Sequence, residues 1–475
     1  MDADHSHKDY FLVTKSFGVT LSWLRRWRYR LLLHRASYVG EANLIRMMHG
    51  PNILHNLRLN LSSAWVRHIV WKRAQDADPV HREAIQARLL TDSVEELIAS
   101  AWHWYEPMMA SRRSQQLRLV GDRDDILAID GNAKLHRRTC GMPFAEVADQ
   151  PTLGKRLLRG CSCRPHGKGT LCQKHAFALQ PSSSAAGTHI LKHKLRRALH
   201  GNDDVTHLEV MLKGFRARWQ PACTIDAGTL ASYFAQGADA RIQARRRRRF
   251  KLRSKGVRGK RGRKEQSFMA SWSSLGPRAS SECSTHKETE AHIAAAARTA
   301  GFLTAVSASG IVFELGELIG AESLSQRYCF LAKVASRLPS LKIVVHDDAC
   351  HLRLIAEGNG QGNPMAARLA SDMSFIVDEY HSSGHVGQWC ARTCMPQLAE
   401  NQALLRGFPT NICETVNSEL SPLGHTVHHM GRWVCQLAVR EMVDVLNMKT
   451  VMQARAKWAN YEKRARNSQK RRRVS

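Results

Sequence analysis

The spacing of apolar residues is helical over the first quarter of the chain. From about Ser22 to Arg118, Leu, Ala, Trp and Arg recur every three to four residues. This spacing predicts a helical, basic N-terminal region over residues 1–120. Its stripe of Trp and Arg side chains could contact DNA, or it could be the core and the solvated cationic face of an ordinary helical unit.

Shorter apolar runs further along the chain are typical of strands. The segment 124–138 (DDILAIDGNAKLHRR) predicts a strand that ends near a turn-prone Asp-Gly-Asn. Two apolar runs separated by Ser-Ala-Ser-Gly predict a hairpin over 301–318. LKIVVHDD, which begins at Leu341, and SFIVDEYH, which begins at Ser374, indicate two more strands. Helical spacing follows over 322–338 and again over 411–447.

Short buried strands that alternate with helices predict a layered α/β domain. The order is strand, hairpin, helix, strand, helix, strand, helix, with a long insertion after the first strand. It matches an RNase H-like fold, although order alone does not choose among several α/β folds. The expected core therefore covers 121–140 and 298–448 and is split by the insertion.

The charge balance favours a polyanionic partner. The chain has 71 Lys and Arg against 41 Asp and Glu, a formal net charge of +30. Nucleic acid is the leading candidate, because basic side chains that neutralise phosphates release counterions. A membrane is not expected, since no apolar run approaches the roughly 18 residues of a spanning helix, and the polar, acidic start is unlike a signal peptide. We expect an intracellular protein that acts in the nucleus.

The densest basic run lies inside the insertion, and residues 240–285 are predicted to be a disordered linker because they contain too few apolar residues to fold alone. The linker could serve as a nuclear import signal, a DNA tether, or both. A second basic segment over 449–475 is predicted to be a tail. The candidate nucleic-acid-binding residues are basic side chains of the linker: Arg245, Arg246, Arg247, Arg248, Arg249, Lys251 and Arg253.

A cluster of cysteines and histidines over 141–200 suggests an inserted zinc module. Four ligands within fifteen positions suit tetrahedral zinc, and metal binding would supply the folding free energy that a small core cannot. A structural role is expected, because four protein ligands leave no open position for water. The first pair has one intervening residue instead of two, so Cys140 or His166 could replace one member. The candidate ligands are Cys161, Cys163, Cys172 and His175.

Three acids stand where strands end or a helix starts: Asp130, Asp347 and Glu414. Convergent carboxylates can hold two divalent cations about 4 Å apart, the arrangement that phosphodiester cleavage uses. Taken singly, each acid also has an ordinary explanation. Asp130 could form a turn, Asp347 could cap a helix, and Glu414 could interact with a helix dipole.

Four segments together resemble the Kyakuja-Dileera-Zisupton (KDZ) group of transposases: IDGNAKLHRR, VVHDDACHL, DEYHSSGHVGQWC and NICETVNSELSPLGHTVHHMGR. The resemblance covers about Asp125 to Asn447. It implies an RNase H-like fold whose catalytic triad is the Asp of a DGN motif, the Asp of a D-x-x-C motif and a helical Glu. These correspond to Asp130, Asp347 and Glu414, which would hold Mg²⁺ or Mn²⁺. The offset to Cys350 favours Asp347 over its neighbour Asp348, which could substitute.

A further motif in this region resembles the acid-x-x-His signature of related transposases. It consists of Asp378 and His381, and His381 could position a phosphate or the flanking acids, or could be an ordinary core histidine. Nearby, His385, Cys390 and Cys394 suggest a second metal site, although their spacing fits no standard zinc module. The supporting residues are Asp348, Asp378 and His381.

The resemblance implies metal-dependent DNA cleavage and strand transfer, with transposon ends and target DNA as partners and with homo-oligomers that bring two ends together. The cysteine cluster that many of these transposases carry at the N-terminus is not found, so targeting of transposon ends could be lost. The alternatives are a catalytically inactive, transposon-derived DNA-binding protein and an RNA-directed nuclease. No phosphate loop of the GxxxxGK[ST] type is present, which argues against an ATP-driven mechanism.

Overall fold

The computed structural model describes residues 6–7, 10–14, 17–33, 41–43, 45, 57–140, 146–153, 155–159, 161–165, 172, 283, 298–320 and 322–474. The seven basic residues singled out in the linker, together with His166 and His175, lie outside these residues.

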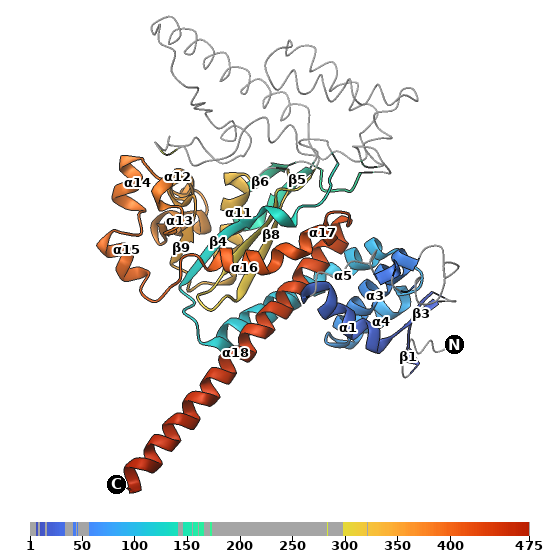
Figure 1. The fold of residues 1–475 in the computed structure, drawn as a ribbon. Helices are drawn as coiled ribbons and strands as arrows, with labels where there is room; N and C mark the ends of the chain where they lie inside the picture. The colour runs from blue at the N-terminus through green and yellow to red at the C-terminus, as the bar shows by residue number, and fades with distance from the viewer. Residues whose placement is uncertain are drawn as a thin grey trace, which may run out of the picture.

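A mixed five-stranded sheet is the centre of the described part of the chain, in the order β10-β9-β4-β7-β8 (Figure 1). β4 is parallel to β9, which is parallel to β10, whereas β7 is antiparallel to both β4 and β8. The prediction of an α/β domain with a helical N-terminal region is confirmed. The strands are β4 (Ile126–Asn132), β7 (Gly301–Val306), β8 (Val312–Leu318), β9 (Ile343–His346) and β10 (Ser374–Ile376).

Helices cover both faces of this sheet, which explains why its strands are continuous apolar runs. Along β4, Ile126 and Ala128 belong to one hydrophobic cluster, whereas Leu127 and Ile129 belong to the other. The first cluster includes α5 (Val94–Val120), α16 (Ile412–Leu420) and α18 (Arg432–Val474). The second includes α11 (Leu324–Arg337), α12 (Ala349–Asn359) and α13 (Pro364–Ser371).

The N-terminal region packs against α5 and begins with three short strands that the helical spacing did not predict. These strands are rich in aromatic and β-branched residues, as in YFLVT. α5 begins with a capping box between Ser93 and Glu96 and ends at Gly121, whose φ of 70° suits glycine. The remaining elements of this region are β1 (Ser6–His7), β2 (Tyr10–Thr14), β3 (Phe17–Thr20), α1 (Leu21–Leu33), α3 (Leu57–Gln75) and α4 (Pro79–Arg88).

The helical spacing over 411–447 corresponds to several helices instead of one. A 3-10 turn over Ser421–Leu423, which contains Pro422, ends the path of α16. Gly424 then begins α17 (Gly424–Val427) where any Cβ would collide with the carbonyl oxygen of Lys134. The other short elements are β5 (Glu146–Gln150), β6 (Lys155–Arg159), α14 (Gln388–Thr393) and α15 (Ala399–Leu404).

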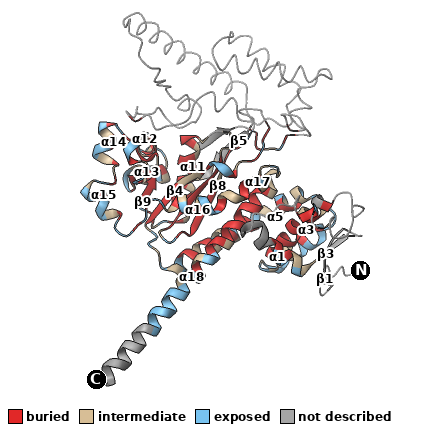
Figure 2. Ribbon diagram, viewed as in Figure 1, coloured by how far each residue is buried: buried red, intermediate tan, exposed pale blue. Residues whose placement is uncertain are grey.

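α18 continues far beyond the core and includes nearly all of the predicted basic tail. Its first half packs against the sheet and α5, whereas residues 455–463 are exposed (Figure 2). Met452, Trp458 and Tyr461 are each more than 60% exposed. Among the described residues, no helix has both the length and the hydropathy that crossing a membrane requires.

Buried ion pairs connect the N-terminal region to α18. Arg73 of α3 donates to both carboxylate oxygens of Glu441 at 2.8 Å and to Asp444 at 2.7 Å. The hydroxyl of Tyr105 donates to Glu441 at 3.0 Å. Burial alone would raise the pKa of Asp444, but Arg73 and Arg112 lower it below its usual value. The network therefore stabilises the contact between these helices only while its acids are charged.

Glu441→Gln should lower the free energy of unfolding by about 3 kcal/mol, because Arg73 stays buried after losing one of its charged acceptors. Urea denaturation at neutral pH measures the change. Glu419→Gln is the matched control, since Glu419 pairs with Lys449 on the surface and its loss should cost less than about 0.5 kcal/mol. Equal effects of the two substitutions would contradict the proposed contribution of the buried network.

Candidate functional site

The pairing of β4 with β9 brings the two candidate aspartates together. Ile129 is the partner of His346 in this parallel register. Asp130 and Asp347 each follow one residue of this pair, so they lie next to each other beside the carboxyl end of β9. Their proximity is also electrostatic, because the charge of Asp347 contributes to the raised pKa of Asp130.

Asp130 lies in an environment that disfavours its ionised form. Burial first, and then the charge of Asp347, raise its pKa to about 7. Oδ2 of Asp130 accepts a hydrogen bond from Nδ2 of Asn417 at 2.8 Å. Asn417 lies one turn after Glu414 on α16, which packs against β4. The same helix therefore orients Asp130 and brings the third candidate acid to the aspartates.

The structure distinguishes Asp347 from its neighbour Asp348. Asp348 accepts from Nη1 of Arg327 at 2.8 Å, and its side chain is 3% exposed. The side chain of Asp347 is 20% exposed, and its Oδ1 lies 2.6 Å from Nδ1 of His346. Burial alone would raise the pKa of Asp347, but His346 and Arg327 lower it. Asp347 is thus a partly exposed carboxylate, whereas Asp348 is held in an internal ion pair.

The third acid, Glu414, forms a group with Asp378 and His381, whose ligand atoms lie within 4.8 Å of one another. Nδ1 of His381 lies 2.7 Å from Asp378 and 4.0 Å from Oε1 of Glu414. Oε2 of Glu414 is buried and has no hydrogen-bond partner among the described residues. Burial would lower the pKa of His381, but Asp378 and the neighbouring carboxylates raise it.

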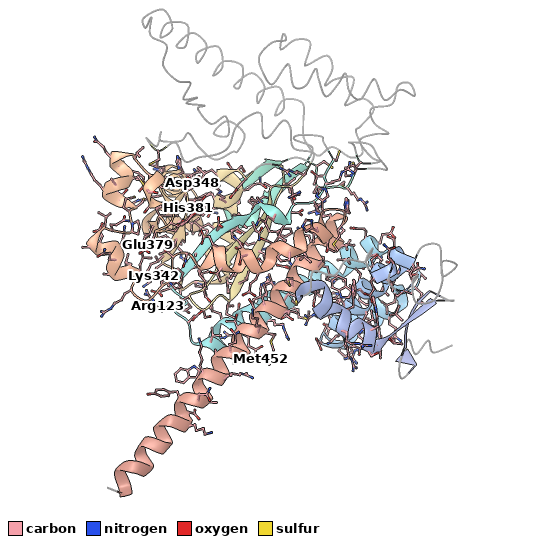
Figure 3. All side chains as sticks on the ribbon, in the orientation of Figure 1. Arg123, Lys342, Asp348, Glu379, His381 and Met452 are labelled. Carbon is pink, nitrogen blue, oxygen red and sulfur yellow. The ribbon has the colours of Figure 1, made fainter. Side chains whose placement is uncertain are left out.

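The site lies at one end of the sheet. Asp348 and His381, which follow β9 and β10, are both labelled near this end (Figure 3). Arg123 and Lys342, which precede β4 and β9, are labelled toward the opposite end (Figure 3). Parallel strands thus deliver their carboxyl-end residues to a common edge, as the sequence pattern predicts.

One acid near the site was not found by sequence reasoning. A Cβ on Gly131 would lie 2.5 Å from Oε1 of Glu322, so this carboxylate approaches the backbone of the DGN motif. Glu322 also contributes to the raised pKa of Asp130 and pairs with Arg327 at 3.0 Å. No sequence motif indicates Glu322, because only the tertiary fold brings it close to the DGN motif.

These residues offer hard oxygen ligands and one imidazole, the donors that divalent cations take. Two observations fit such an ion. Burial first, and then the charges of Asp347 and Glu322, raise the pKa of Asp130, so a cation would relieve the repulsion among these acids. In addition, the buried Oε2 of Glu414 has no donor in the described part of the chain.

Two further groups could hold zinc. The sulfurs of Cys140, Cys161 and Cys172 lie within 4.8 Å of one another. Cys140 thus joins two of the predicted ligands, as the sequence allowed. Cys163 is outside this group of sulfurs, although its backbone N–H donates to Sγ of Cys161 at 3.4 Å. His175 is not among the described residues.

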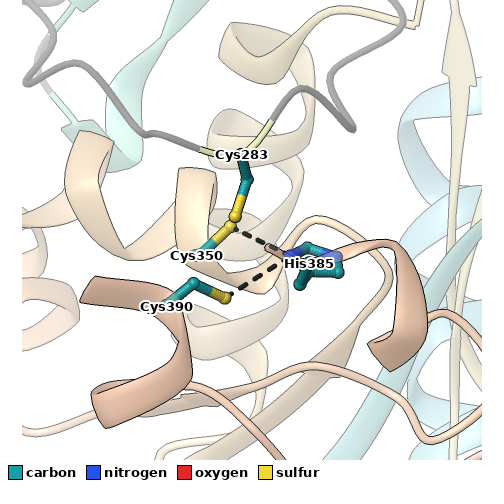
Figure 4. Close-up of side chains that lie close together, drawn as sticks. All are labelled: Cys283, Cys350, His385 and Cys390. Carbon is teal, nitrogen blue, oxygen red and sulfur yellow. Dashed lines mark hydrogen bonds between the residues drawn. The ribbon is translucent and has the colours of Figure 1, made fainter. Parts of the chain in front are cut away.

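The second group is buried and contains Cys283, Cys350, His385 and Cys390 (Figure 4). Of these four, only His385 and Cys390 were indicated as metal ligands by their spacing in the sequence. Cys394, which the sequence also suggested for this site, is not a member. Cys350 was noted only as part of the D-x-x-C motif, and no spacing rule would have linked Cys283 to the others.

No protein-family model matches the chain, and no curated protein or solved structure matches it.

The raised pKa of Asp130 predicts how stability depends on pH without added Mg²⁺ or Mn²⁺. The pKa of Asp130 in the folded state is about 7, and the usual pKa of an aspartate is 3.8. Between pH 4 and pH 7 the folded state therefore holds a proton that the unfolded state releases, so stability falls as pH rises. Asp130→Asn lacks this loss and should be more stable than the wild type at pH 8, by on the order of 3 kcal/mol.

Urea denaturation at pH 4.5, 6 and 8 measures this difference, which should grow with pH. Asp372→Asn, at an exposed acid after α13, is the control and should show no such trend. Parallel curves for the wild type and Asp130→Asn would mean that Asp130 ionises as an ordinary aspartate.

Proposed function

We propose that the chain is a DDE-type transposase of the KDZ kind, a nuclear enzyme that cuts DNA and transfers strands with two Mg²⁺ or Mn²⁺ ions. Its core would be an RNase H-like domain, split by the insertion. The observation that carries the proposal is the position of Asp347, whose charge acts on both Asp130 and Glu414, two acids from distant parts of the chain. The order of strands and helices along the chain supports the same fold.

Each residue of the site has a role in this proposal. Asp130, Asp347 and Glu414 would hold the cations. When bound, the two ions activate the attacking oxygen and stabilise the leaving oxygen of a phosphodiester. Asn417 fixes Asp130 through Oδ2, and Arg327 neutralises Asp348, which leaves Asp347 as the accessible ligand at its position.

His381 would contact the phosphate. Asp378 orients its ring through Nδ1 and also accepts from the backbone N–H of His381 at 2.9 Å. Because the pKa of His381 is raised, its protonated form is favoured, and an imidazolium attracts a phosphate oxygen. The pair Asp378 and His381 would therefore position DNA beside the acids.

The net charge of +30 supports DNA as the substrate, with salt-sensitive affinity. In this proposal the basic residues from Arg245 to Arg253 hold DNA near the core, and copies of the chain assemble to bring two ends together. The alternative is a transposon-derived protein that binds DNA through these residues and does not cut it.

The proposal is tested with supercoiled plasmid DNA and purified full-length protein in Mg²⁺ or Mn²⁺. The wild type should nick or linearise the plasmid. Asp130→Asn, Asp347→Asn and Glu414→Gln should each cut at least about 1,000-fold more slowly, because each loss removes several kcal/mol of transition-state stabilisation. DNA affinity, measured by fluorescence anisotropy, should change less than about threefold. Asp372→Asn is the matched control and should cut like the wild type.

Cutting that survives all three substitutions would place the chemistry elsewhere or in a contaminant. Binding by the wild type without cutting would favour the non-catalytic DNA-binding alternative. A preference for RNA or RNA–DNA hybrids over duplex DNA would indicate an RNA-directed nuclease.

A further inference from the structure

The buried group of three cysteines and one histidine connects segments that are distant in the sequence. Cys350 lies in the first turn of α12, and Cys390 lies in α14. His385 follows a short 3-10 turn, and Cys283 comes from the insertion. All four ligand atoms lie within 4.8 Å of one another, and the four side chains point toward a common centre (Figure 4).

The distances in this group fit a tetrahedral ion. Nδ1 of His385 lies 3.4 Å from the sulfur of Cys350 and 3.4 Å from the sulfur of Cys390. Zinc bonds of about 2.3 Å to sulfur and about 2.0 Å to nitrogen give ligand separations of about 3.6 Å at a tetrahedral centre. Three thiolates and one imidazole are a common structural zinc set.

The hydrogen bond of His385 sets the ring in the form that a metal needs. Its Nε2 lies 2.7 Å from the carbonyl oxygen of Asp347. A carbonyl only accepts, so Nε2 carries the proton and Nδ1 presents its lone pair to the two sulfurs. Histidine ligands of zinc usually donate their other N–H to a carbonyl or carboxylate in this way.

We propose that Cys283, Cys350, His385 and Cys390 form a structural zinc site that positions the backbone of Asp347 and fastens the insertion to the core. His385 reaches the Asp347 carbonyl directly, and Cys350 lies three residues after Asp347. Zinc would thus position the turn after β9 through two ligands, His385 and Cys350. The positioning role rests on the proposed cation site, whereas zinc binding does not.

Zinc content of the full-length protein, purified and desalted, tests the site. Cys390→Ser and Cys283→Ser should each contain one zinc fewer per chain than the wild type by mass spectrometry. The Cys140, Cys161 and Cys172 group is unchanged in these variants, so any zinc there cancels in the comparison. Cys394→Ser is the matched control, a buried cysteine four residues after Cys390, and should retain the wild-type content. Equal zinc in the wild type and both ligand variants would overturn the proposal.

A second measurement does not depend on the folding of the ligand variants. In Cys161→Ser, which disrupts the other group, zinc X-ray absorption should show a first shell of three sulfurs and one nitrogen. No zinc, or a shell of oxygen and nitrogen alone, would overturn the site.

Manganese binding tests the positioning role. Cys390→Ser should bind Mn²⁺ about 10-fold more weakly than Cys394→Ser by electron paramagnetic resonance, if zinc orients Asp347. Unchanged Mn²⁺ affinity after the loss of zinc would overturn the positioning role and leave the zinc site standing. Absence of Mn²⁺ binding by the wild type would instead refute the cation site of the proposed function.

Discussion

The parallel pairing of β4 with β9 is the contact on which the arrangement of the candidate site depends. It pairs Ile129 with His346 and so sets Asp130 beside Asp347. Because side chains alternate between the two faces of a strand, a slip of one residue would turn Asp130 toward the opposite layer of helices. The apolar residues of β4 prevent that slip, since both of their alternating sets are buried in separate clusters. The core therefore fixes the position of the acids.

The buried acids around this pairing have two different kinds of environment. Arg73 pairs with both Glu441 and Asp444, and Arg73 and Arg112 lower the pKa of Asp444. Asp130 is buried beside other acids instead, and burial first, then the charge of Asp347, raise its pKa. Removing one partner of the first arrangement would leave a buried charge uncompensated, whereas the second arrangement costs free energy in the absence of a cation. Such a difference between neighbouring parts of one core is typical of a site shaped for binding.

The sequence predicted the features that depend on local pattern. The strands around Asp130 and Asp347 are short apolar runs that end in acids, and periodicity identified both. It could not identify Glu322 or Cys283, because tertiary contacts bring them to their groups from segments without a motif. The first strands of the chain were missed since they are short and precede a strong helical pattern. Likewise, α16 and α18 were merged because the turn between them interrupts the periodicity only briefly.

The length of α18 also determines how long a partner must be to contact both the core and the end of this helix. The helix is exposed at Met452 and continues to Val474. At about 1.5 Å per residue, the end of the helix lies roughly 33 Å from Met452. This is about the length of ten base pairs of duplex DNA, at roughly 3.4 Å each. A partner that touches both the core and the tip of α18 must therefore be extended, and compact ligands can reach only one of them.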